Sequence, residues 1–132
     1  MKRLVILVYL LCAFSVGLLA QSNQEEASAS IVFEKTTHDF GEIKKGSDAF
    51  YEFKFTNNGD APLIVTEVKA FCSCNTAEWS KEPIAPGKTG IIKVKYDTTR
   101  RMGKFNKALL VSSNTKYSPL SITVKGNVLD EE

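Results

Sequence analysis

The sequence predicts an all-β protein, an immunoglobulin-like antiparallel β-sandwich of about seven strands. Short runs of alternating apolar and polar residues recur from residue 31 onward, and turn residues such as Gly, Pro and Asn separate them. No segment of this region has a convincing helical period. Seven short strands in about 100 residues fit this sandwich. The distant cysteine pair and intervening tryptophan of antibody domains are absent, so we expect the architecture without that core signature.

The strands expected in chain order are 31–34, 49–57, 63–71, a weak strand at 76–79, 90–98, 104–113 and 120–129. Residues 39–43 are interpreted as part of the connection into the strand at 49–57. In that strand the aromatic residues at 51, 53 and 55 share one face, because side chains alternate along a strand. The same rule places Ile64, Thr66, Val68, Ala70 and Cys72 on one side of the strand at 63–71 and its end. It also places Ile92, Val94 and Tyr96 inward in 90–98.

The N-terminus predicts export. Lys2 and Arg3 precede an apolar run at 4–19 that ends near Ala20, which is typical of a cleaved signal peptide at 1–20. Leu18 stands where a small residue is preferred, so an uncleaved anchor stays an alternative, although the run is short against the roughly 20 residues of a membrane span. We expect a flexible tether at 21–30, a domain at 31–129, no integral membrane span after cleavage, and a periplasmic or secreted location.

The charge balance argues against nucleic-acid binding. The chain has 17 basic and 15 acidic residues, and removal of Lys2 and Arg3 leaves 15 of each. Acidic tails account for five of these acids, so the folded part is only mildly basic at 15 minus 10, or +5. The partner expected from composition is an unknown protein or an envelope component, bound by a monomer without a cofactor.

Several motifs occur in a recognisable order. They are Thr-His-Asp-Phe-Gly-Glu-Ile at 37–43, Phe-Lys-Phe-Thr-Asn-Asn-Gly at 53–59 with Pro-Leu-Ile-Val at 62–65, Cys-Ser-Cys at 72–74, Pro-Ile-Ala-Pro-Gly at 83–87, Tyr-Asp-Thr at 96–98 and Gly-Lys-Phe-Asn-Lys at 103–107. In this order they resemble the exported bacterial domain of unknown function family 1573, over nearly all of 31–128. That family is similar in fold to hydin-type and ASPM-type Ig-like repeats. The resemblance implies an exported Ig-like domain and supplies no activity, ligand or catalytic residue.

Cys72 and Cys74 are the only cysteines outside the predicted signal peptide. A buried thiol or a structural bond is one interpretation. An oxidising envelope favours a disulfide, which needs a bend at Ser73 because extended residues two apart have Cα atoms about 6.6 Å apart. Closing so short a loop contributes only about 1.6 kcal/mol in the chain-entropy model. A redox pair that exchanges with thiols is the second interpretation. The third is a soft-metal site for Cu(I) in which His38 or Met102 joins the two thiolates.

An enzyme is not expected. A Cys-His-Asp set drawn from Cys72, His38 and Asp39 fails because adjacent residues of an extended chain point to opposite sides. No glycine loop for phosphate is present in the sequence.

A binding surface is the remaining candidate site. Basic residues gather in sequence around one predicted hairpin and would attract anionic envelope polymers or an acidic protein face, or else form a solvated outer face. They are Lys93, Lys95, Arg100, Arg101, Lys104 and Lys107. Trp79 is either a core plug or an exposed interface anchor. The sequence therefore favours an exported Ig-like binding or structural module of the cell envelope, with thiol-disulfide or copper chemistry at the cysteine pair as the alternative.

Overall fold

The computed structural model describes residues 26–130. The predicted signal peptide at 1–20 and the first half of the predicted tether, 21–25, lie outside the described residues. Among the described residues, no helix is long and apolar enough to cross a membrane.

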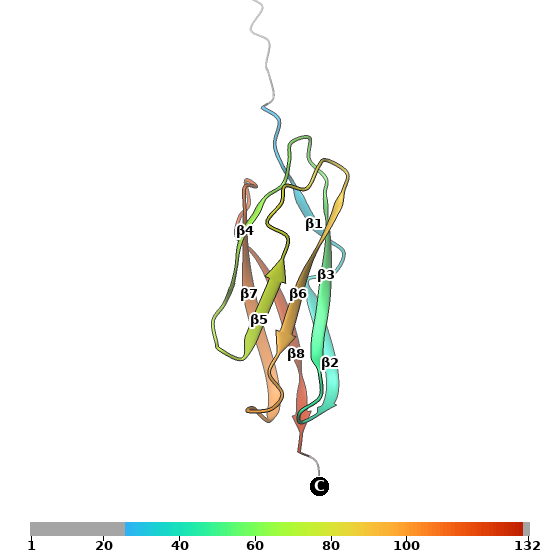
Figure 1. Ribbon diagram of the computed structural model, residues 1–132, viewed down its shortest axis with the longest axis vertical. Helices are drawn as coiled ribbons and strands as arrows, with labels where there is room; N and C mark the ends of the chain where they lie inside the picture. The colour runs from blue at the N-terminus through green and yellow to red at the C-terminus, as the bar shows by residue number, and fades with distance from the viewer. Residues whose placement is uncertain (1–25, 131–132) are drawn as a thin grey trace, which may run out of the picture.

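Eight strands form two sheets that face each other (Figure 1). The strands are β1 (Ile31–Phe33), β2 (Thr37–Lys44), β3 (Ala49–Asn57), β4 (Val65–Ala70), β5 (Asn75–Trp79), β6 (Thr89–Tyr96), β7 (Gly103–Ser113) and β8 (Leu120–Leu129). The first sheet has the order β1-β3-β6-β5 and the second has the order β2-β8-β7-β4. We call them sheet A and sheet B. The predicted all-β sandwich is thus confirmed.

The strand order explains why there are eight strands rather than about seven. If β1 is strand A of an immunoglobulin domain, sheet A has the order A-B-E-D, and β4, β7 and β8 supply strands C, F and G. The additional strand, β2, continues the first strand on the other sheet and pairs in parallel with β8. The expectation that 39–43 belongs to a connection is therefore wrong. The remaining pairs are antiparallel.

The core lies between the two sheets and follows the alternation seen in the sequence. Phe53 and Phe55 of β3 are buried, while Glu52 and Lys54 between them are exposed. The inward face predicted for β6 is likewise buried, and Ile122 and Val124 of β8 with Leu109 of β7 complete the layer. Burial of such apolar area is the main stabilising contribution to the fold, so truncating one of these side chains to Ala costs roughly 2–5 kcal/mol.

Two β-bulges interrupt the alternation of buried and exposed residues along a strand, and at the one in β4 the predicted inner face is wrong. In β4 the register with β7 shifts between Val65 and Glu67. Val65 is consequently buried, while Thr66, which we expected on the inner face, is exposed. A bulge inserts an extra residue and so reverses the faces on one side of it. In β2 a similar shift lies between Asp39 and Glu42, and Gly41 there has a φ of 66°.

The end of the predicted tether is attached to the domain. Asp60 N donates to Ser28 O at 3.0 Å, and Asn58 N donates to Ser30 O at 2.9 Å. Gly59 makes this close approach feasible, because a Cβ there would lie 2.6 Å from Ser30 N. Residues 28–30 therefore belong to the folded unit rather than to a free tether.

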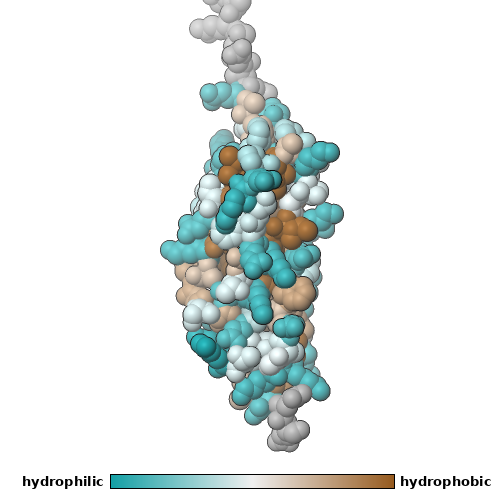
Figure 2. All heavy atoms as spheres, in the orientation of Figure 1, coloured by the Kyte–Doolittle hydropathy of each residue, from teal (hydrophilic) through white to brown (hydrophobic). Residues whose placement is uncertain are grey.

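The outer face of sheet A is mixed in character. Figure 2 shows hydrophobic side chains as separate brown areas among hydrophilic ones on the face seen in Figure 1. Val32, Phe50 and Ile91 are about half exposed on this face. Lys93 Nζ lies 4.5 Å from the Phe50 ring centroid, so one of the three is covered by a cation.

Candidate functional site

The two cysteines form a disulfide in the connection between β4 and β5. Their Cα atoms are 5.2 Å apart, which requires the chain to bend at Ser73, as expected from the sequence. Cys74 is 3% exposed and Cys72 is half-buried. Because both sulfur atoms are bonded to each other, neither is present as the thiolate that nucleophilic attack or metal binding needs.

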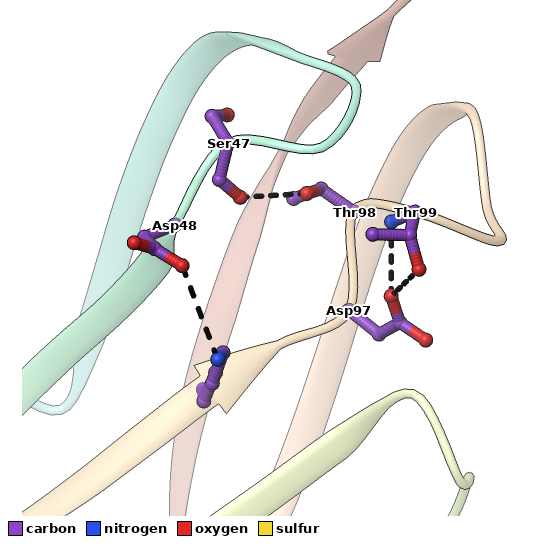
Figure 3. A network of polar contacts seen from close by, with 6 residues as sticks. Ser47, Asp48, Asp97, Thr98 and Thr99 are labelled. Atoms are coloured by element: carbon purple, nitrogen blue, oxygen red, sulfur yellow. Dashed lines mark hydrogen bonds and ion pairs between the residues drawn. The ribbon is translucent and has the colours of Figure 1, made fainter.

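Backbone and side-chain hydrogen bonds fix the disulfide loop to its surroundings. Asp97 N donates to Cys74 O at 2.8 Å, which extends the pairing of β5 and β6 by one residue. Asp97 Oδ1 in turn accepts from Thr99 N at 2.9 Å and from Thr99 Oγ1 at 2.5 Å, and this closes a tight turn (Figure 3). The loop after β6 is thus held in one shape by its own side chains.

The neighbouring connection between β2 and β3 is tied to the same loop. Thr98, which is 2% exposed, donates from Oγ1 to Ser47 O at 2.7 Å. Asp48 of the same connection lies 3.9 Å from Lys95 Nζ of β6, a contact that is drawn as a dashed line in Figure 3. Three connections therefore meet at one end of the sandwich.

A hollow of about 350 Å³ lies between these three connections. Its polar lining includes Ser47, Asp48, Ser73, Lys95, Asp97 and Thr99, and Cys74 lies at its wall. The hydrogen bonds from the Thr99 hydroxyl and then from the Thr99 backbone N–H hold the pKa of Asp97 below its ordinary value, with a smaller contribution from Arg100. Asp97 therefore presents a carboxylate to the hollow at neutral pH.

Asn75 follows the disulfide and is the polar residue that sequence reasoning missed. It is 6% exposed, and neither Oδ1 nor Nδ2 has a hydrogen-bond partner within the described residues. An unpaired buried polar group usually costs about 1–3 kcal/mol. The available signal was the alternation of 75, 77 and 79, which places this amide on the inner face of β5.

The structure does not bring the predicted metal ligands together. His38 stacks on Tyr51 with ring centroids 3.8 Å apart, and its ring also meets Phe40 at 4.6 Å. Burial first, and then Lys35, lowers the pKa of His38. Met102 lies in the loop before β7 and is 54% exposed. Residues 26–130 contain no group of three or more His, Cys, Asp or Glu side chains placed to hold a metal ion.

Trp79 combines features of the two alternatives drawn from the sequence, a core plug and an exposed interface anchor. It is half-buried, and its Nε1 donates to Val65 O at 3.2 Å, so it connects sheet A to sheet B. Lys81 Nζ lies 3.0 Å from the ring centroid and covers the outer side. These contacts are those of a plug at the edge of the sandwich.

The predicted basic residues do not form one surface. Lys93 and Lys95 are on β6 in sheet A, Arg100 and Arg101 are in the loop that follows, and Lys104 and Lys107 are on β7 in sheet B. Lys104 is on the outer face of its sheet, whereas Lys107 shares the alternation of the buried Phe105 and Leu109. The six residues are therefore divided between the two sides of the molecule.

Comparison with known proteins gives a family and a fold. A family model described as "Protein of unknown function (DUF1573)" matches residues 31–128. No curated protein matches the chain. Among solved structures, the chain is similar to a Porphyromonas gingivalis W83 protein of unknown function, with 17% identity over 76% of this chain and 47% of that one, and a TM-score of 0.65. The chain thus spans about half the length of that protein.

Two further structures share the architecture. One is the ASH/PapD-like domain 7 of human CEP192, with 10% identity, 89% of this chain and 98% of that one covered, and a TM-score of 0.67. The other is the secreted serine protease VesC from Vibrio cholerae, with 18% identity over 81% of this chain and 24% of that one, and a TM-score of 0.56. At these identities the likeness shows an Ig-like fold.

Proposed function

Since the chain belongs to the family described as Protein of unknown function (DUF1573), we propose that it is an exported, non-enzymatic binding module of the bacterial envelope that holds a protein partner at the disulfide end of its sandwich. The observation that carries the proposal is the disulfide loop, which accepts a hydrogen bond from the backbone of Asp97 beside a polar hollow. Loops at the ends of such sandwiches are the usual carriers of recognition.

Preorganisation is the physical advantage of this arrangement. The disulfide, the Asp97 turn and the Thr98 to Ser47 hydrogen bond each remove conformational freedom before a partner arrives. A loop that is already ordered loses less entropy on binding, and each side chain immobilised in advance contributes roughly 0.5–1.5 kcal/mol to affinity. The unpaired amide of Asn75 behind the loop is a local cost of the kind that functional sites retain.

Site-specific photocrosslinking in cells tests where the partner binds. A photoreactive benzoylphenylalanine replaces Ser73 or Thr99 at the disulfide end, and the matched control replaces the exposed Ser121 on the outer face of β8. We expect Ser73 and Thr99 to give the same protein adduct and Ser121 to give none. Adducts of equal yield from Ser121 would contradict the proposed location.

A second step uses the purified partner identified from that adduct. Ser73→Arg fills the hollow with a long cationic side chain and should weaken binding at least tenfold, while Ser121→Arg should leave affinity within twofold. The dissociation constant is measured by calorimetry at fixed salt. If Ser73→Arg binds as tightly as the unchanged chain, the disulfide end is not the contact surface.

Export is tested separately by cell fractionation and N-terminal sequencing of the mature protein. We expect the chain in the periplasmic or extracellular fraction, beginning near Gln21. A chain that is found in the cytoplasm with Met1 retained would overturn the proposed location.

Thiol-disulfide exchange is a second candidate function, and the partial exposure of Cys72 beside the buried Cys74 favours it. A thiolate of a partner dithiol would attack Cys72 Sγ, and Cys74 would leave as a thiolate and take up a proton. The second thiol of the partner would then release Cys72, so the partner is oxidised to a disulfide and the pair gains two electrons and two protons. A partner variant that keeps only its attacking cysteine should form a mixed disulfide with Cys72 of the unchanged protein and release Cys74 as a thiol. Alkylation of that Cys74 thiol traps the adduct, which mass spectrometry detects. If no adduct forms with a purified dithiol oxidoreductase, this function is excluded.

A further inference from the structure

Two lysines on the outer face of sheet B differ from the basic side chains of sheet A in having no partner among the described residues, although Lys69 of sheet B does lie 5.7 Å from the Phe71 ring centroid. On sheet A, Lys54 lies 3.6 Å from Glu34, Lys95 lies 3.9 Å from Asp48, and Lys93 covers Phe50. On sheet B, Lys104 and Lys125 form no hydrogen bond, ion pair or ring contact within the part of the chain that the structure describes. The ammonium groups of Lys104 and Lys125 are therefore available on the outer face of sheet B.

These two lysines belong to a regular arrangement that we call the Lys-Asn square. Lys104 of β7 is paired with Asn127 of β8, and Asn106 of β7 is paired with Lys125 of β8. All four lie on the outer face, because Phe105 and Val128 of the alternate set are buried. The two lysines are diagonal neighbours, so their Cα atoms are about 7–8 Å apart, within reach of one anionic group.

The bulge in β2 leaves a hollow of about 510 Å³ beside the square. Between Asp39 and Glu42 the strand departs from regular pairing with β8, opposite Gly126. Gly126 cannot carry a side chain easily, since a Cβ would lie 3.0 Å from the Phe105 ring and 3.1 Å from Gly41 O. Bulges of this kind are common beside binding sites. The four residues of the square line this hollow together with Phe105, Gly126 and Gly41.

Two carboxylates form the rim of the hollow on the β2 side. Asp39 Oδ1 accepts a hydrogen bond from Gly41 N at 2.8 Å, and Glu42 is exposed. These two side chains would repel a ligand whose own carboxylates are closely spaced. Each of them also has an oxygen that accepts a hydrogen bond from a ligand hydroxyl group. The surface thus combines two cations for an anion with amides and carboxylates for hydroxyls.

From this combination we propose that the Lys-Asn square and the hollow beside it bind an acidic polysaccharide that carries carboxylates on hydroxyl-rich sugars. The ammonium groups of Lys104 and Lys125 pair with a carboxylate, and the amides of Asn106 and Asn127 both donate to and accept from sugar hydroxyls. The surface lies on the outer face of sheet B, and the proposed protein contact lies at the disulfide end. The domain would hold an envelope polymer and a protein by different surfaces.

The test compares three polymers on the full mature chain by calorimetry at low salt. The probes are polygalacturonate, poly-glutamate as an acidic peptide, and neutral dextran. We expect binding to polygalacturonate that weakens as salt is added, binding to poly-glutamate at least tenfold weaker, and none to dextran. Equal binding of poly-glutamate would overturn the sugar component of the proposal, and absence of binding to polygalacturonate would overturn it entirely.

Matched variants locate the site. Lys104→Ala with Lys125→Ala, and separately Asn106→Ala with Asn127→Ala, should each reduce binding to polygalacturonate at least tenfold. The control, Lys54→Ala with Lys93→Ala on sheet A, should stay within twofold. All three pairs lie on exposed or half-exposed positions, and thermal unfolding verifies that each variant is folded. If the sheet A control loses binding as strongly as the Lys104 and Lys125 pair, the attraction is a general charge effect.

The two proposals fail independently. Ser73→Arg should leave polygalacturonate binding within twofold, since Ser73 lies at the disulfide end. Loss of partner binding in that variant with polymer binding retained would support both proposals, and a loss of both would contradict the separation of the two surfaces.

Discussion

Each end of the sandwich buries an asparagine, and the two ends differ in whether its side chain has hydrogen-bond partners. At the end where the described chain begins, Asn57 is 0% exposed and fully engaged. Its Nδ2 donates to Ala61 O at 2.8 Å and to Ile84 O at 2.9 Å, and its Oδ1 accepts from Gly59 N at 3.0 Å. At the disulfide end, Asn75 is buried without any such partner among residues 26–130.

The difference indicates a structural end and an end available for binding. The Asn57 network fixes the turn after β3, the loop before β6 and Ser30 in one arrangement, and Ser30 N reaches Oδ1 at 3.4 Å. Satisfied buried networks of this kind specify a unique structure. The disulfide end is held instead by a covalent bond and by exposed turns, which stabilise the loop without filling the hollow beside it.

Removing the network should have the largest effect. Asn57→Ala leaves Ala61 O, Gly59 N and Ser30 N without their side-chain partner, so we expect a loss of about 3 kcal/mol in the free energy of unfolding. Ile84 O keeps the hydrogen bond from Leu63 N. Urea denaturation measures it. Asn58→Ala, at an exposed neighbour, is the control and should change the free energy by less than about 0.5 kcal/mol. A similar small change in both variants would remove the contrast between the two ends.

Removing the disulfide should cost less. Cys72→Ala with Cys74→Ala opens a loop of only three residues, so the chain-entropy model predicts a loss of about 1.6 kcal/mol. Part of any loss comes from the buried Cys74 side chain itself. Reduction of the unchanged protein, measured by the same urea titration, separates the covalent contribution from packing. A loss larger than that of Asn57→Ala would make the disulfide end the principal structural end.

Acid should weaken the disulfide end at Asp97 specifically. Its pKa is lowered in the folded state by the hydrogen bonds from Thr99, so its contribution to stability is present above the ordinary Asp value of about 3.9. That contribution is lost as the pH falls from this value through the lower folded pKa. Asp97→Asn should flatten the part of the stability curve that lies below about pH 4. A curve identical to that of the unchanged chain would show that the turn does not depend on the charge.

Asn75 should give the smallest effect, and one of opposite sign. Asn75→Val removes an amide without partners and introduces a residue that favours strands. We therefore expect the free energy of unfolding to rise, or to change by less than about 0.5 kcal/mol. Urea denaturation checks this result against Asn57→Val, which should be strongly destabilising. A loss above about 1 kcal/mol would show that Asn75 has a polar partner, and would weaken the contrast.

Sequence patterns predicted most of the sandwich because alternation reports burial directly. The faces of β3, β6 and β8 follow it residue by residue, and the motif order at 31–128 corresponds to the family that the comparison shows. The prediction fails where a bulge interrupts the alternation, at Gly41 in β2 and between Val65 and Glu67 in β4. A bulge is defined by two strands together, so one strand's sequence does not reveal it.

The candidate sites could be predicted from the sequence less completely than the fold. Cys72 and Cys74 were identified from spacing and environment, but the hollow beside them requires the connections that contain Ser47 and Asp97 to meet the disulfide loop. The six basic residues looked continuous along the sequence, yet consecutive strands β6 and β7 belong to different sheets. Nearness in sequence across a sandwich crossing therefore says little about a shared surface.

By itself, the sequence determined the all-β class, the family and the closeness of the cysteine pair, because these follow from local alternation, motif order and the short reach of three residues. Only the tertiary structure decided which strand continues on which sheet, that Lys104 and Lys125 of neighbouring strands share an outer face with Asn106 and Asn127, and that Asn57 is satisfied while Asn75 is not. The physical reason is that strand pairing, hydrogen-bond satisfaction and hollows are properties of residues distant in the chain. Local patterns constrain each strand, and only packing determines its neighbours.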